Sequence, residues 1–350
     1  MNIALFSKHL PSDEPNGVSI QVHRLAEALC ALGHKVTVYT LSKTVQGASY
    51  CCVTLNSTLK SPVMKKFAPA LAFRRTDKSL FDILHYHGDD WLCRGSGCRV
   101  RTFYGSALME ALHATTLSRF CYQALFYLLE WVSCFREGAL VAISRNTRLA
   151  LPVVKTFIPC CVPTNRFFPS GEKSRNPSII FIGDLTSRKR GALLLDHFTR
   201  NVLPVHPDCT LTVVGPATCS GRNITYLGRA DEKSLIDALR SSWLLCMPSS
   251  YEGFGVPIIE AMACGTTVVA TRNPGSESLI CHRENGWLCT PKDLGTAITG
   301  LILDTKTREA LAASALQNIR RYDPDLIARQ YESLYTSLLR KNGTDVPGRV

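Results

Sequence analysis

One stretch of the sequence, from Trp243 to Gly265, constrains the fold more than any other because it combines a strand, a tight loop and a helix. The run 243–247 is short and apolar and is followed by Pro248, which suits a buried strand that ends there. Pro257 fits the first turn of a helix, because the N–H that proline lacks would be unpaired there anyway. Gly265 fits the end of the same helix. The stretch therefore predicts a strand that leads through a glycine loop into a helix.

The same order of elements opens the chain. Residues 3–6 form a short apolar strand, and a helix with apolar residues at helical spacing follows and ends at Gly33. Residues 35–40 alternate as the next strand, which makes a βαβ unit and predicts a parallel sheet. A second series of strands and helices starts at 178–182, after the polar stretch 170–177. With 350 residues, the chain is long enough for two α/β domains.

The loop before Pro257 and the start of the helix have the properties of a phosphate-binding site. A helix N-terminus presents unpaired N–H groups and the positive end of the helix dipole, which attract phosphate. Gly253 and Gly255 let the backbone come close to a ligand. Glu252 precedes the loop and Glu260 lies about one turn into the helix, so the two carboxylates bracket the amides. Because a carboxylate can accept two hydrogen bonds from a vicinal diol, these residues predict a ligand in which phosphate joins a sugar to a ribose.

Glu252 and Glu260, with Gly-Phe-Gly-Val-Pro between them, resemble the E-x7-E motif of the family 4 retaining glycosyltransferases, or glycosyl transferases group 1. The resemblance covers nearly the whole chain. It implies the GT-B fold, in which two Rossmann-like domains with doubly wound parallel sheets face a deep cleft. The implied parts are an N-terminal acceptor-side domain at 1–169, a linker at 170–177 and a C-terminal nucleotide-sugar-binding domain at 178–323. A last helix at 324–340 is expected to pack back on the N-terminal domain.

The resemblance also implies roles for these residues. In the family the second glutamate, here Glu260, holds the donor ribose. Glu252 and the loop amides hold the transferred sugar and the pyrophosphate. The loop residues are Gly253, Phe254, Gly255 and Val256. The implied reaction moves a hexose-type sugar from a UDP-sugar or another nucleotide-diphosphate sugar to an acceptor hydroxyl with retention of anomeric configuration. A donor phosphate oxygen would take the acceptor proton, and we expect no metal and no other cofactor.

Three adjacent cations follow the predicted strand at 178–182, namely Arg188, Lys189 and Arg190. At a strand-to-helix junction they would neutralise the charge that develops on a pyrophosphate leaving group, and such electrostatic stabilisation is usually the largest catalytic term. The resembled family has Gly-Arg here, and Lys-Gly six residues later. Asp184 stands in place of that arginine and Arg190 in place of that lysine, so we expect Arg188 or Lys189 to substitute for the missing arginine. The alternative is a solvated basic helix start.

The N-terminal half has candidate residues next to predicted strand ends. Asn16 and Gly17 occupy the loop where the resembled family has a Gly-Gly pair that faces the donor. His85 belongs to a D-x-x-H-x-H pattern, although a satisfied, half-buried histidine is an equally good interpretation. Tyr104 stands where many relatives have a histidine close to the reacting sugar. A phenol titrates at about 10 and does not replace imidazole near neutrality, so either the acceptor chemistry differs or the role has moved to His85 or His113.

The net charge of +12 fits an anionic small ligand, an anionic membrane surface or nucleic acid. The sequence has no nucleic-acid-binding motif, so we expect no nucleic-acid partner. Two short runs interleave basic and aromatic residues, which would suit anionic lipid, although a solvated face is the commoner explanation. Their basic residues are Lys60, Lys65, Lys66, Arg74 and Arg75. The longest apolar run, 121–135, contains Glu130 and is too short and too charged to span a bilayer.

The sequence has 15 cysteines, an odd number, and no C-x-x-C pair. This usage is typical of reduced cytosolic cysteines that serve as small hydrophobic residues, and a zinc site is not expected. No signal-peptide pattern opens the chain. We therefore expect a cytoplasmic protein that can make peripheral contact with the inner membrane surface.

Three alternative functions stay open at this point. A nucleotide-sugar epimerase of the same fold would need acid–base groups at the sugar and no second substrate pocket. A catalytically impaired nucleotide-sugar-binding protein would explain Tyr104 and Asp184. A membrane-surface scaffold would rest on the basic region around Lys65 and Arg74. Acceptors in the resembled family are lipids, saccharides or small natural products.

Overall fold

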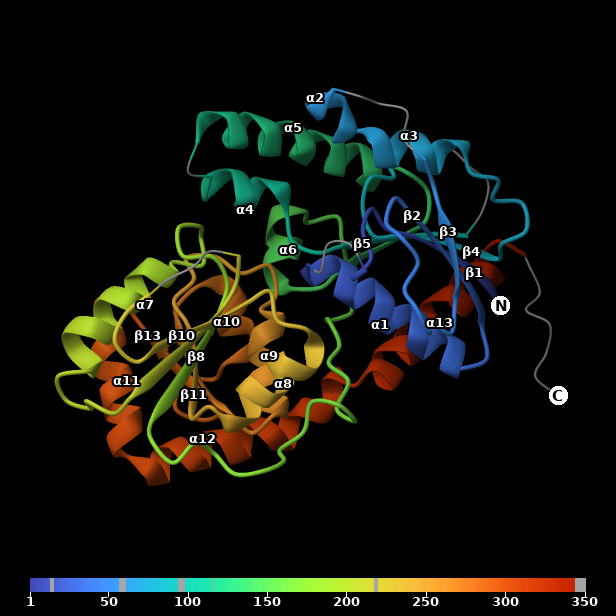
Figure 1. The fold of residues 1–350 in the computed structure, drawn as a ribbon. Coiled ribbons are helices and arrows are strands. Elements are labelled where there is room, and N and C mark those ends of the chain that lie inside the picture. The colour runs from blue at the N-terminus through green and yellow to red at the C-terminus, as the bar shows by residue number, and fades with distance from the viewer. Residues whose placement is uncertain (13–15, 57–60, 94–97, 115, 217–219, 344–350) are drawn as a thin grey trace. The chain divides into compact units, whose positions relative to one another are not determined.

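The computed structural model describes residues 1–12, 16–56, 61–93, 98–114, 116–216 and 220–343. The chain forms two compact units (Figure 1). Unit 1 contains Met1–Cys161 and the C-terminal segment from Pro324, and unit 2 contains Val162–Asp323. Each unit has a parallel sheet and several helices, which confirms the predicted fold class of two α/β domains. The expected cleft between the domains stays a prediction.

Unit 1 is built on a seven-stranded parallel sheet with the order β3-β2-β1-β4-β5-β6-β7. The strands are β1 (Asn2–Phe6), β2 (Lys35–Thr40), β3 (Cys51–Thr54), β4 (Ile83–Tyr86), β5 (Cys98–Phe103), β6 (Ala139–Ala142) and β7 (Thr156–Phe157). The helices are α1 (Gly17–Ala31), α2 (Pro62–Lys65), α3 (Ala68–Arg75), α4 (Ala107–Leu112), α5 (Leu117–Cys134), α6 (Arg145–Ala150) and α13 (Pro324–Lys341). The strand order reverses between β1 and β4, and doubly wound sheets bind ligands at the carboxyl ends of strands at such a switch point.

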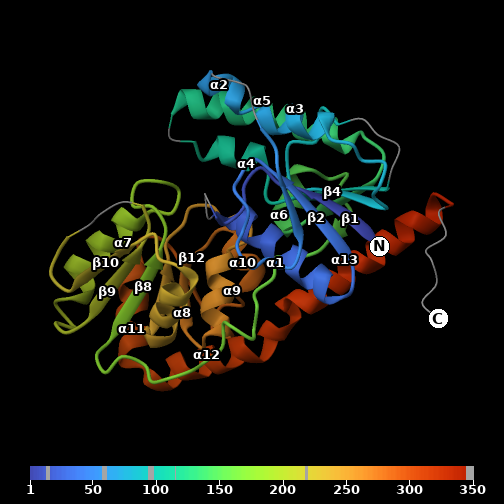
Figure 2. The same cartoon turned by 45° about the vertical axis from the view of Figure 1, so that its right-hand side comes forward.

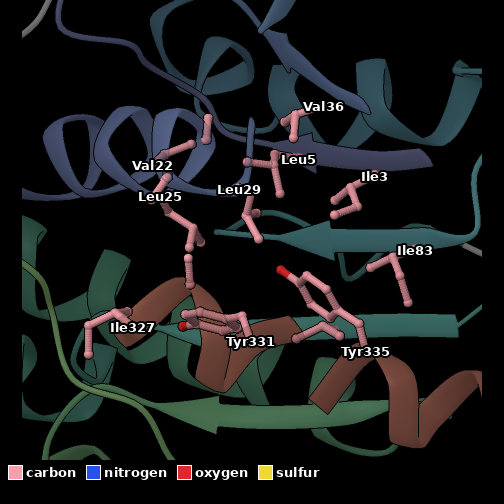
Figure 3. Close-up of a cluster of buried hydrophobic side chains, with 14 of the residues drawn as sticks. Ile3, Leu5, Val22, Leu25, Leu29, Val36, Ile83, Ile327, Tyr331 and Tyr335 are labelled. Carbon is pink, nitrogen blue, oxygen red and sulfur yellow. The ribbon is translucent and has the colours of Figure 1, made fainter. Parts of the chain in front are cut away.

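The last helix of the chain, α13, belongs to the core of unit 1 (Figures 1 and 2). Its residues Ile327, Tyr331 and Tyr335 pack in one buried cluster with Leu29 of α1 and Ile3 of β1 (Figure 3). Burial of such large side chains is the main stabilising contribution to a fold of this kind. The helix is therefore part of the first unit, although it follows the second unit in the sequence.

Unit 2 has a six-stranded parallel sheet with the order β10-β9-β8-β11-β12-β13. The strands are β8 (Ser178–Ile182), β9 (Thr210–Val214), β10 (Ile224–Gly228), β11 (Leu244–Met247), β12 (Thr267–Thr271) and β13 (Trp287–Cys289). The helices are α7 (Gly191–His197), the π-helical η1 (Phe198–Val202), α8 (Glu232–Ser241), α9 (Val256–Ala263), α10 (Pro274–Leu279), α11 (Leu294–Leu303), α12 (Thr305–Asn318) and the 3-10 turn η2 (Ile319–Tyr322). The switch point lies between β8 and β11.

The boundary between the units comes earlier than the polar stretch at 170–177 indicates. Unit 2 begins at Val162, whose N–H donates to the Tyr322 carbonyl over 2.8 Å. Lys173, inside the expected linker, donates from Nζ to the Ser242 carbonyl over 2.8 Å. The hydrogen bond of Lys173 attaches the stretch to unit 2. It is polar because most of its side chains are exposed, and not because it separates two domains.

Candidate functional site

The carboxyl ends of β8 and β11 are neighbours at the switch point of the unit 2 sheet. The loop after β8, at 183–190, carries the three adjacent cations, and the loop after β11, at 248–255, carries Glu252. The Ser250 N–H donates to the Arg188 carbonyl over 2.8 Å, so the two loops contact each other directly. Ligand-binding crevices of open α/β sheets lie at such strand ends.

Arg188 and Lys189 both contact the carboxylate of Glu252, although Arg188 and Glu252 are 64 residues apart in the sequence. Lys189 Nζ lies 2.7 Å from Oε1, and Arg188 NH1 lies 3.3 Å from Oε2. Glu252 is only 4% exposed, and burial acts to raise its pKa. The two cations outweigh burial and lower the pKa below its ordinary value. Glu252 is therefore ionised at neutral pH and accepts hydrogen bonds.

Asp184, which stands where the resembled family has an arginine, shapes the cationic loop. Its carboxylate accepts from the N–H groups of Thr186 (2.7 Å) and Ser187 (3.3 Å). The bond from the Thr186 N–H is the main reason why the pKa of Asp184 is lowered. Gly183 has φ +155°, and a Cβ there would lie 2.9 Å from Cγ of Lys189. Asp184, the residue that departs from the family pattern, therefore holds the backbone of the loop that carries Lys189.

Arg190 makes different contacts from its two neighbours. Its Nε donates to the Pro248 carbonyl over 2.7 Å, and its NH2 donates to Oγ1 of Thr271 over 3.3 Å. The side chain therefore connects the loop after β8 to the carboxyl ends of β11 and β12. This geometry gives Arg190 a positioning role, and its expected contact with pyrophosphate stays a prediction.

Gly255 makes the sharp entry into α9. Its φ of +102° favours glycine, and an added Cβ would lie 3.0 Å from Cδ1 of Ile258. The Ile258 N–H donates to the Gly255 carbonyl over 2.8 Å, which forms the first turn of the helix. The Val256 N–H lies at the start of this turn, where backbone N–H groups have no acceptor within the helix. Phe254 is buried, and its ring meets that of Tyr322 edge-on at 6.0 Å between centroids. Phe254 thus anchors the loop to the core, and a ligand would meet the loop backbone.

Glu260 is buried in α9, one turn beyond the loop. The helix ends where Gly265 adopts φ +67° and donates its N–H to the Met262 carbonyl over 3.1 Å, as the sequence predicted. Glu252 and Glu260 therefore flank the start of the same helix, and Gly253 lies in the loop between them.

Gly275 is a site residue that the sequence pattern did not reveal. A Cβ at this position would lie 2.4 Å from the carbonyl oxygen of Glu252 and 2.5 Å from its Cβ. Asn273 caps α10 by accepting from the Gly275 and Ser276 N–H groups, each over 3.1 Å. Its Nδ2 donates to the Ser249 carbonyl over 3.1 Å. The start of α10 thus presses on the Glu252 loop. The sequence offered one signal for this role, an Asn-Pro-Gly turn soon after β12. The carboxyl end of β12 lies at the same edge of the sheet as that of β11, which precedes Glu252.

Unit 1 has a pocket of about 310 Å³ lined by the carboxyl-terminal half of β5, by residues that follow β4 and β5, and by one side of α5. Tyr104, a predicted catalytic residue, lines it, and its hydroxyl lies 2.9 Å from Nδ1 of His87. Within the described part of the chain, neither Nε2 of His87 nor NH1 of Arg101 has a hydrogen-bond partner, although both atoms are buried. Buried polar atoms without partners are rare, so this pocket is a second candidate site.

Burial controls the titration of the groups in this pocket. Desolvation, and then the charge of Arg101, lower the pKa of His87 to about 3, so its imidazole is neutral at neutral pH. Desolvation raises the pKa of Tyr104 well above its ordinary value, so the phenol keeps its proton. Desolvation also raises the pKa of Glu130 to about 7, although it accepts a hydrogen bond from the Ala107 N–H. When the phenol donates to Nδ1 of His87, the ring proton is on Nε2 and is available to a ligand.

His85 lies in the core of unit 1. Its Nδ1 is 2.7 Å from the Tyr335 hydroxyl, and its Nε2 is 2.8 Å from Oγ1 of Thr102. Burial, followed by the nearby His87 and Arg101, lowers its pKa well below the ordinary value. The structure thus favours the second of the two interpretations, a satisfied histidine, over a catalytic role.

Asn16 caps α1 as its oxygen accepts from the N–H groups of Val18 (3.1 Å) and Ser19 (3.0 Å). Gly17 is the first residue of α1, and no atom lies within 4 Å of a Cβ built there. His113 lies at the C-terminal end of α4. The expected roles of Asn16 and Gly17 toward a donor stay predictions.

Among the described residues, no group of three or more His, Cys, Asp or Glu side chains could hold a metal ion. No helix within the same residues is long and apolar enough to cross a membrane. The 14 cysteines in the described ranges form no disulfide with one another. Lys60, which the basic pattern includes, lies outside the described residues.

Residues 164–318 match the model of the family described as glycosyl transferases group 1. A phosphatidyl-myo-inositol mannosyltransferase from Mycolicibacterium smegmatis is 24% identical over 362 residues, which cover 93% of this chain and 91% of that protein. The structure resembles sucrose-phosphate synthase from Thermosynechococcus elongatus, with a TM-score of 0.82, 22% identity and coverage of 97% of this chain and 99% of the other. It also resembles Anabaena HepE in complex with UDP-glucose, with a TM-score of 0.76, 16% identity and coverage of 96% and 100%.

Proposed function

We propose a specific reaction for this chain, which belongs to the group 1 glycosyltransferases and has the GT-B fold. It transfers a hexose-type sugar from a nucleotide-diphosphate sugar to an acceptor hydroxyl, with retention of anomeric configuration. The observation that carries this proposal is the contact of Arg188 and Lys189 with ionised Glu252 at the switch point of unit 2. This contact brings two cations and a hydrogen-bond acceptor together beside the start of a helix.

The donor diphosphate binds to Arg188 and Lys189 and to the backbone amides at the start of α9. Glu252 already holds both cations in place, so little reorganisation is needed when the pyrophosphate arrives. The ionised Glu252 also accepts hydrogen bonds from hydroxyls of the transferred sugar. Glu260 binds the ribose, as the family resemblance implies. HepE, a structural neighbour, was crystallised with UDP-glucose, which supports a UDP-sugar as the first donor to test.

The transfer exchanges one bond at the anomeric carbon for another. The bond from this carbon to the diphosphate oxygen breaks, and the leaving diphosphate takes the bonding electrons. The acceptor oxygen forms the new bond on the same face of the sugar, and its proton passes to the departing phosphate oxygen. Arg188 and Lys189 stabilise the charge that develops on this oxygen. The products are the glycoside and a nucleoside diphosphate.

No metal and no other cofactor takes part in this reaction, because the two cations supply the positive charge at the leaving group. We therefore expect EDTA to leave the rate of sugar transfer unchanged. A loss of activity that Mg²⁺ or Mn²⁺ restores would contradict this point.

The acceptor binds in the pocket of unit 1. His87 Nε2 and Arg101 NH1 are buried donors without partners among the described residues, and they suit an acceptor that carries several oxygen atoms. Trp91, Tyr122 and Phe126 line the same pocket and suit an apolar part of the molecule. A lipid with a polar head fits both features better than a plain saccharide or a small polar natural product. The name of the mycobacterial relative, which specifies a phosphatidyl lipid, supports this choice.

We place the reaction in the cytoplasm, with peripheral contact at the inner membrane surface. Exposed Lys65, Lys66, Arg74 and Arg75 on or next to α2 and α3 support contact with anionic lipid.

Calorimetry with UDP-glucose, UDP-galactose, UDP-N-acetylglucosamine and GDP-mannose tests the donor, and release of the nucleoside diphosphate with a lipid extract tests the transfer. We expect Glu252→Gln and Lys189→Gln to lower the rate by about 10²-fold or more. Lys233→Gln, an exposed residue of α8 in the same unit, is the control and should change nothing.

Three results would overturn the proposal. Glu252→Gln and Lys189→Gln enzymes that turn over at the wild-type rate would remove the catalytic role of the cluster. An epimer that forms from the donor alone would assign an epimerase. Donor binding with neither hydrolysis nor transfer would assign a binding protein.

A further inference from the structure

Asp89 has a backbone conformation that is uncommon outside glycine. It follows β4 at the carboxyl edge of the unit 1 sheet, and its φ is +56°, directly after Gly88 with φ +153°. An aspartate in this left-handed region is ordinarily helped by a hydrogen bond from its own side chain to nearby backbone. The described residues offer the Asp89 carboxylate no hydrogen bond and no ion pair. Backbone strain without a local structural reason is typical of functional sites.

The Asp89 carboxylate belongs to the pocket of unit 1. Lys8, Arg101 and Tyr122 line this pocket with it. Burial raises the pKa of Asp89 to about 6, although the charges of Arg101 and Lys8 act to lower it. Burial, followed by the charge of Asp89, raises the pKa of Tyr122 to about 12. Groups from three different parts of unit 1 thus interact with this carboxylate, which is mostly ionised at neutral pH and accepts hydrogen bonds.

Asp90, the next residue, is occupied by contacts in the core. Its Oδ1 accepts from Oγ of Ser133 over 2.7 Å and lies 3.3 Å from Nε of Arg101, and its Oδ2 contacts Arg99. The side chain of Asp90 is fully buried. Asp90 therefore makes the structural contacts at this strand end. Asp89 makes none of them and is left open to the pocket.

Three buried donors line the same pocket. They are NH1 of Arg101, Nε2 of His87 and Nε1 of Trp91, and none of them has a hydrogen-bond partner in the part of the chain that the structure describes. A Cβ built on Gly88 would lie 3.7 Å from NH1 of Arg101. The open arginine donor is therefore beside the backbone that leads into Asp89.

An open acceptor among open donors suits one kind of ligand better than another. A hydroxyl group both donates and accepts, so neighbouring hydroxyls satisfy a carboxylate and the donors beside it. A phosphate only accepts, and its charge would repel that of Asp89. Buried polar atoms without partners are costly, so a ligand that satisfies both kinds of group gains most. The pocket therefore favours hydroxyls over an anion.

We propose that Asp89 selects the acceptor by accepting hydrogen bonds from two neighbouring hydroxyls of an uncharged polyol ring. Arg101 and His87 donate to oxygen atoms of the same ring. Phe126, which lines the pocket, packs against its C–H groups. This role of Asp89 rests on the proposed function, in which the pocket binds the acceptor. Asp89 is then a specificity-determining residue that takes no part in donor binding.

Ligand-detected NMR of the full chain tests this role. The probes are D-glucose and myo-inositol, with cyclohexanol as the analogue that lacks a second hydroxyl, and binding of inorganic phosphate is followed by phosphorus NMR. We expect both polyols to bind more tightly than cyclohexanol. Asp89→Asn should weaken polyol binding about tenfold or more, because a charged acceptor is lost. Asparagine tolerates the left-handed backbone, so this variant keeps the fold.

Two further variants separate chemistry from folding. Asp77→Asn is the matched control, because Asp77 is exposed in unit 1 and lies outside the pocket. It should bind both polyols like the wild type. Asp89→Gly removes the carboxylate and relieves the left-handed strain. This variant should have a thermal midpoint at or above that of the wild type and should lose polyol binding as Asp89→Asn does.

Three results would overturn the role of Asp89. They are polyol binding that Asp89→Asn leaves unchanged, a wild type that binds neither polyol, and phosphate binding that Asp89→Asn strengthens, which would make the pocket an anion site. Donor binding in unit 2 and nucleotide release are measured in parallel. If these stay intact when the polyol results fail, the proposed reaction stands without this role of Asp89. A wild type that binds polyols through Asp89 but neither binds nor turns over a donor contradicts the proposed reaction alone.

Discussion

Substitution of Gly275 by alanine is expected to displace Glu252 without removing any group that binds the donor. The new Cβ would lie 2.4 Å from the Glu252 carbonyl oxygen, whereas ordinary contacts begin at 3.4 Å. One of the two segments must therefore move by the difference, which is roughly 1 Å. Both segments are backbone, so no flexible side chain can absorb the movement.

A movement of this size predicts two measurable effects. Misplacement of a catalytic group by roughly 1 Å can lower the rate about 10²-fold, so we expect this loss in kcat/KM for nucleotide release. Overpacking of a tight contact costs about 1–3 kcal/mol in the free energy of unfolding. The affinity for the donor, measured by calorimetry, should fall as well, because Glu252 holds both Arg188 and Lys189.

Gly300→Ala provides the matched control. Gly300 lies in α11 of the same unit, and no atom lies within 4 Å of a Cβ built there. This variant should keep wild-type kcat/KM and a thermal midpoint at or above that of the wild type, because alanine is favoured over glycine inside a helix. If Gly275→Ala remains folded and keeps wild-type kcat/KM and donor affinity, the reasoning that α10 positions Glu252 is wrong.

Three further predictions test other parts of the structure. Because the folded pKa of Glu252 is lowered, its contribution to stability is present above the unfolded value of about 4.3 and is lost as the pH falls through the folded value. Lys189→Met reduces this lowering, so acid unfolding followed by circular dichroism should begin at a higher pH than in the wild type, and identical curves would contradict the ion pair. Tyr104→Phe removes the hydroxyl from Nδ1 of His87 and should raise the acceptor KM while the donor Kd stays the same; a changed donor Kd would count against an acceptor site in this pocket. His85→Phe leaves the buried Tyr335 hydroxyl without this partner and should lower the free energy of unfolding by about 1–3 kcal/mol, with kcat/KM unchanged. A tenfold loss of kcat/KM at full stability would instead restore a catalytic role for His85.

The fold was predictable from local patterns. Short apolar strands followed by helices with apolar faces indicated two parallel α/β domains, and the sheets have this form. Gly255 and Pro257 marked the start of α9 correctly because left-handed backbone and a missing N–H restrict where each residue can stand. The domain boundary expected at 170–177 differs from the observed start of unit 2 at Val162. The polarity of a segment indicates that its side chains are exposed, but it does not indicate which unit the segment forms hydrogen bonds with.

The candidate site was predictable only in part. The Glu252 and Glu260 motif and the cations at 188–190 were visible in the sequence, which led us to expect all three cations at the pyrophosphate. In the structure two of them contact Glu252, while Arg190 contacts Pro248 and Thr271. Gly275 was missed because its role depends on a contact with a strand loop and not on its own neighbours in the chain.

The sequence by itself determined where strands, turns and helix starts lie, because these depend on backbone restrictions and on the spacing of apolar residues over a few positions. Tertiary structure decided which loops meet. The order of strands in the sheet brings Arg188 next to Glu252, and the return of α13 brings Tyr335 to His85 across 250 residues. It also decided that His87, and not His85, lines the pocket of unit 1. Such contacts join segments that are far apart in the chain, and short-range patterns in the sequence carry no record of them.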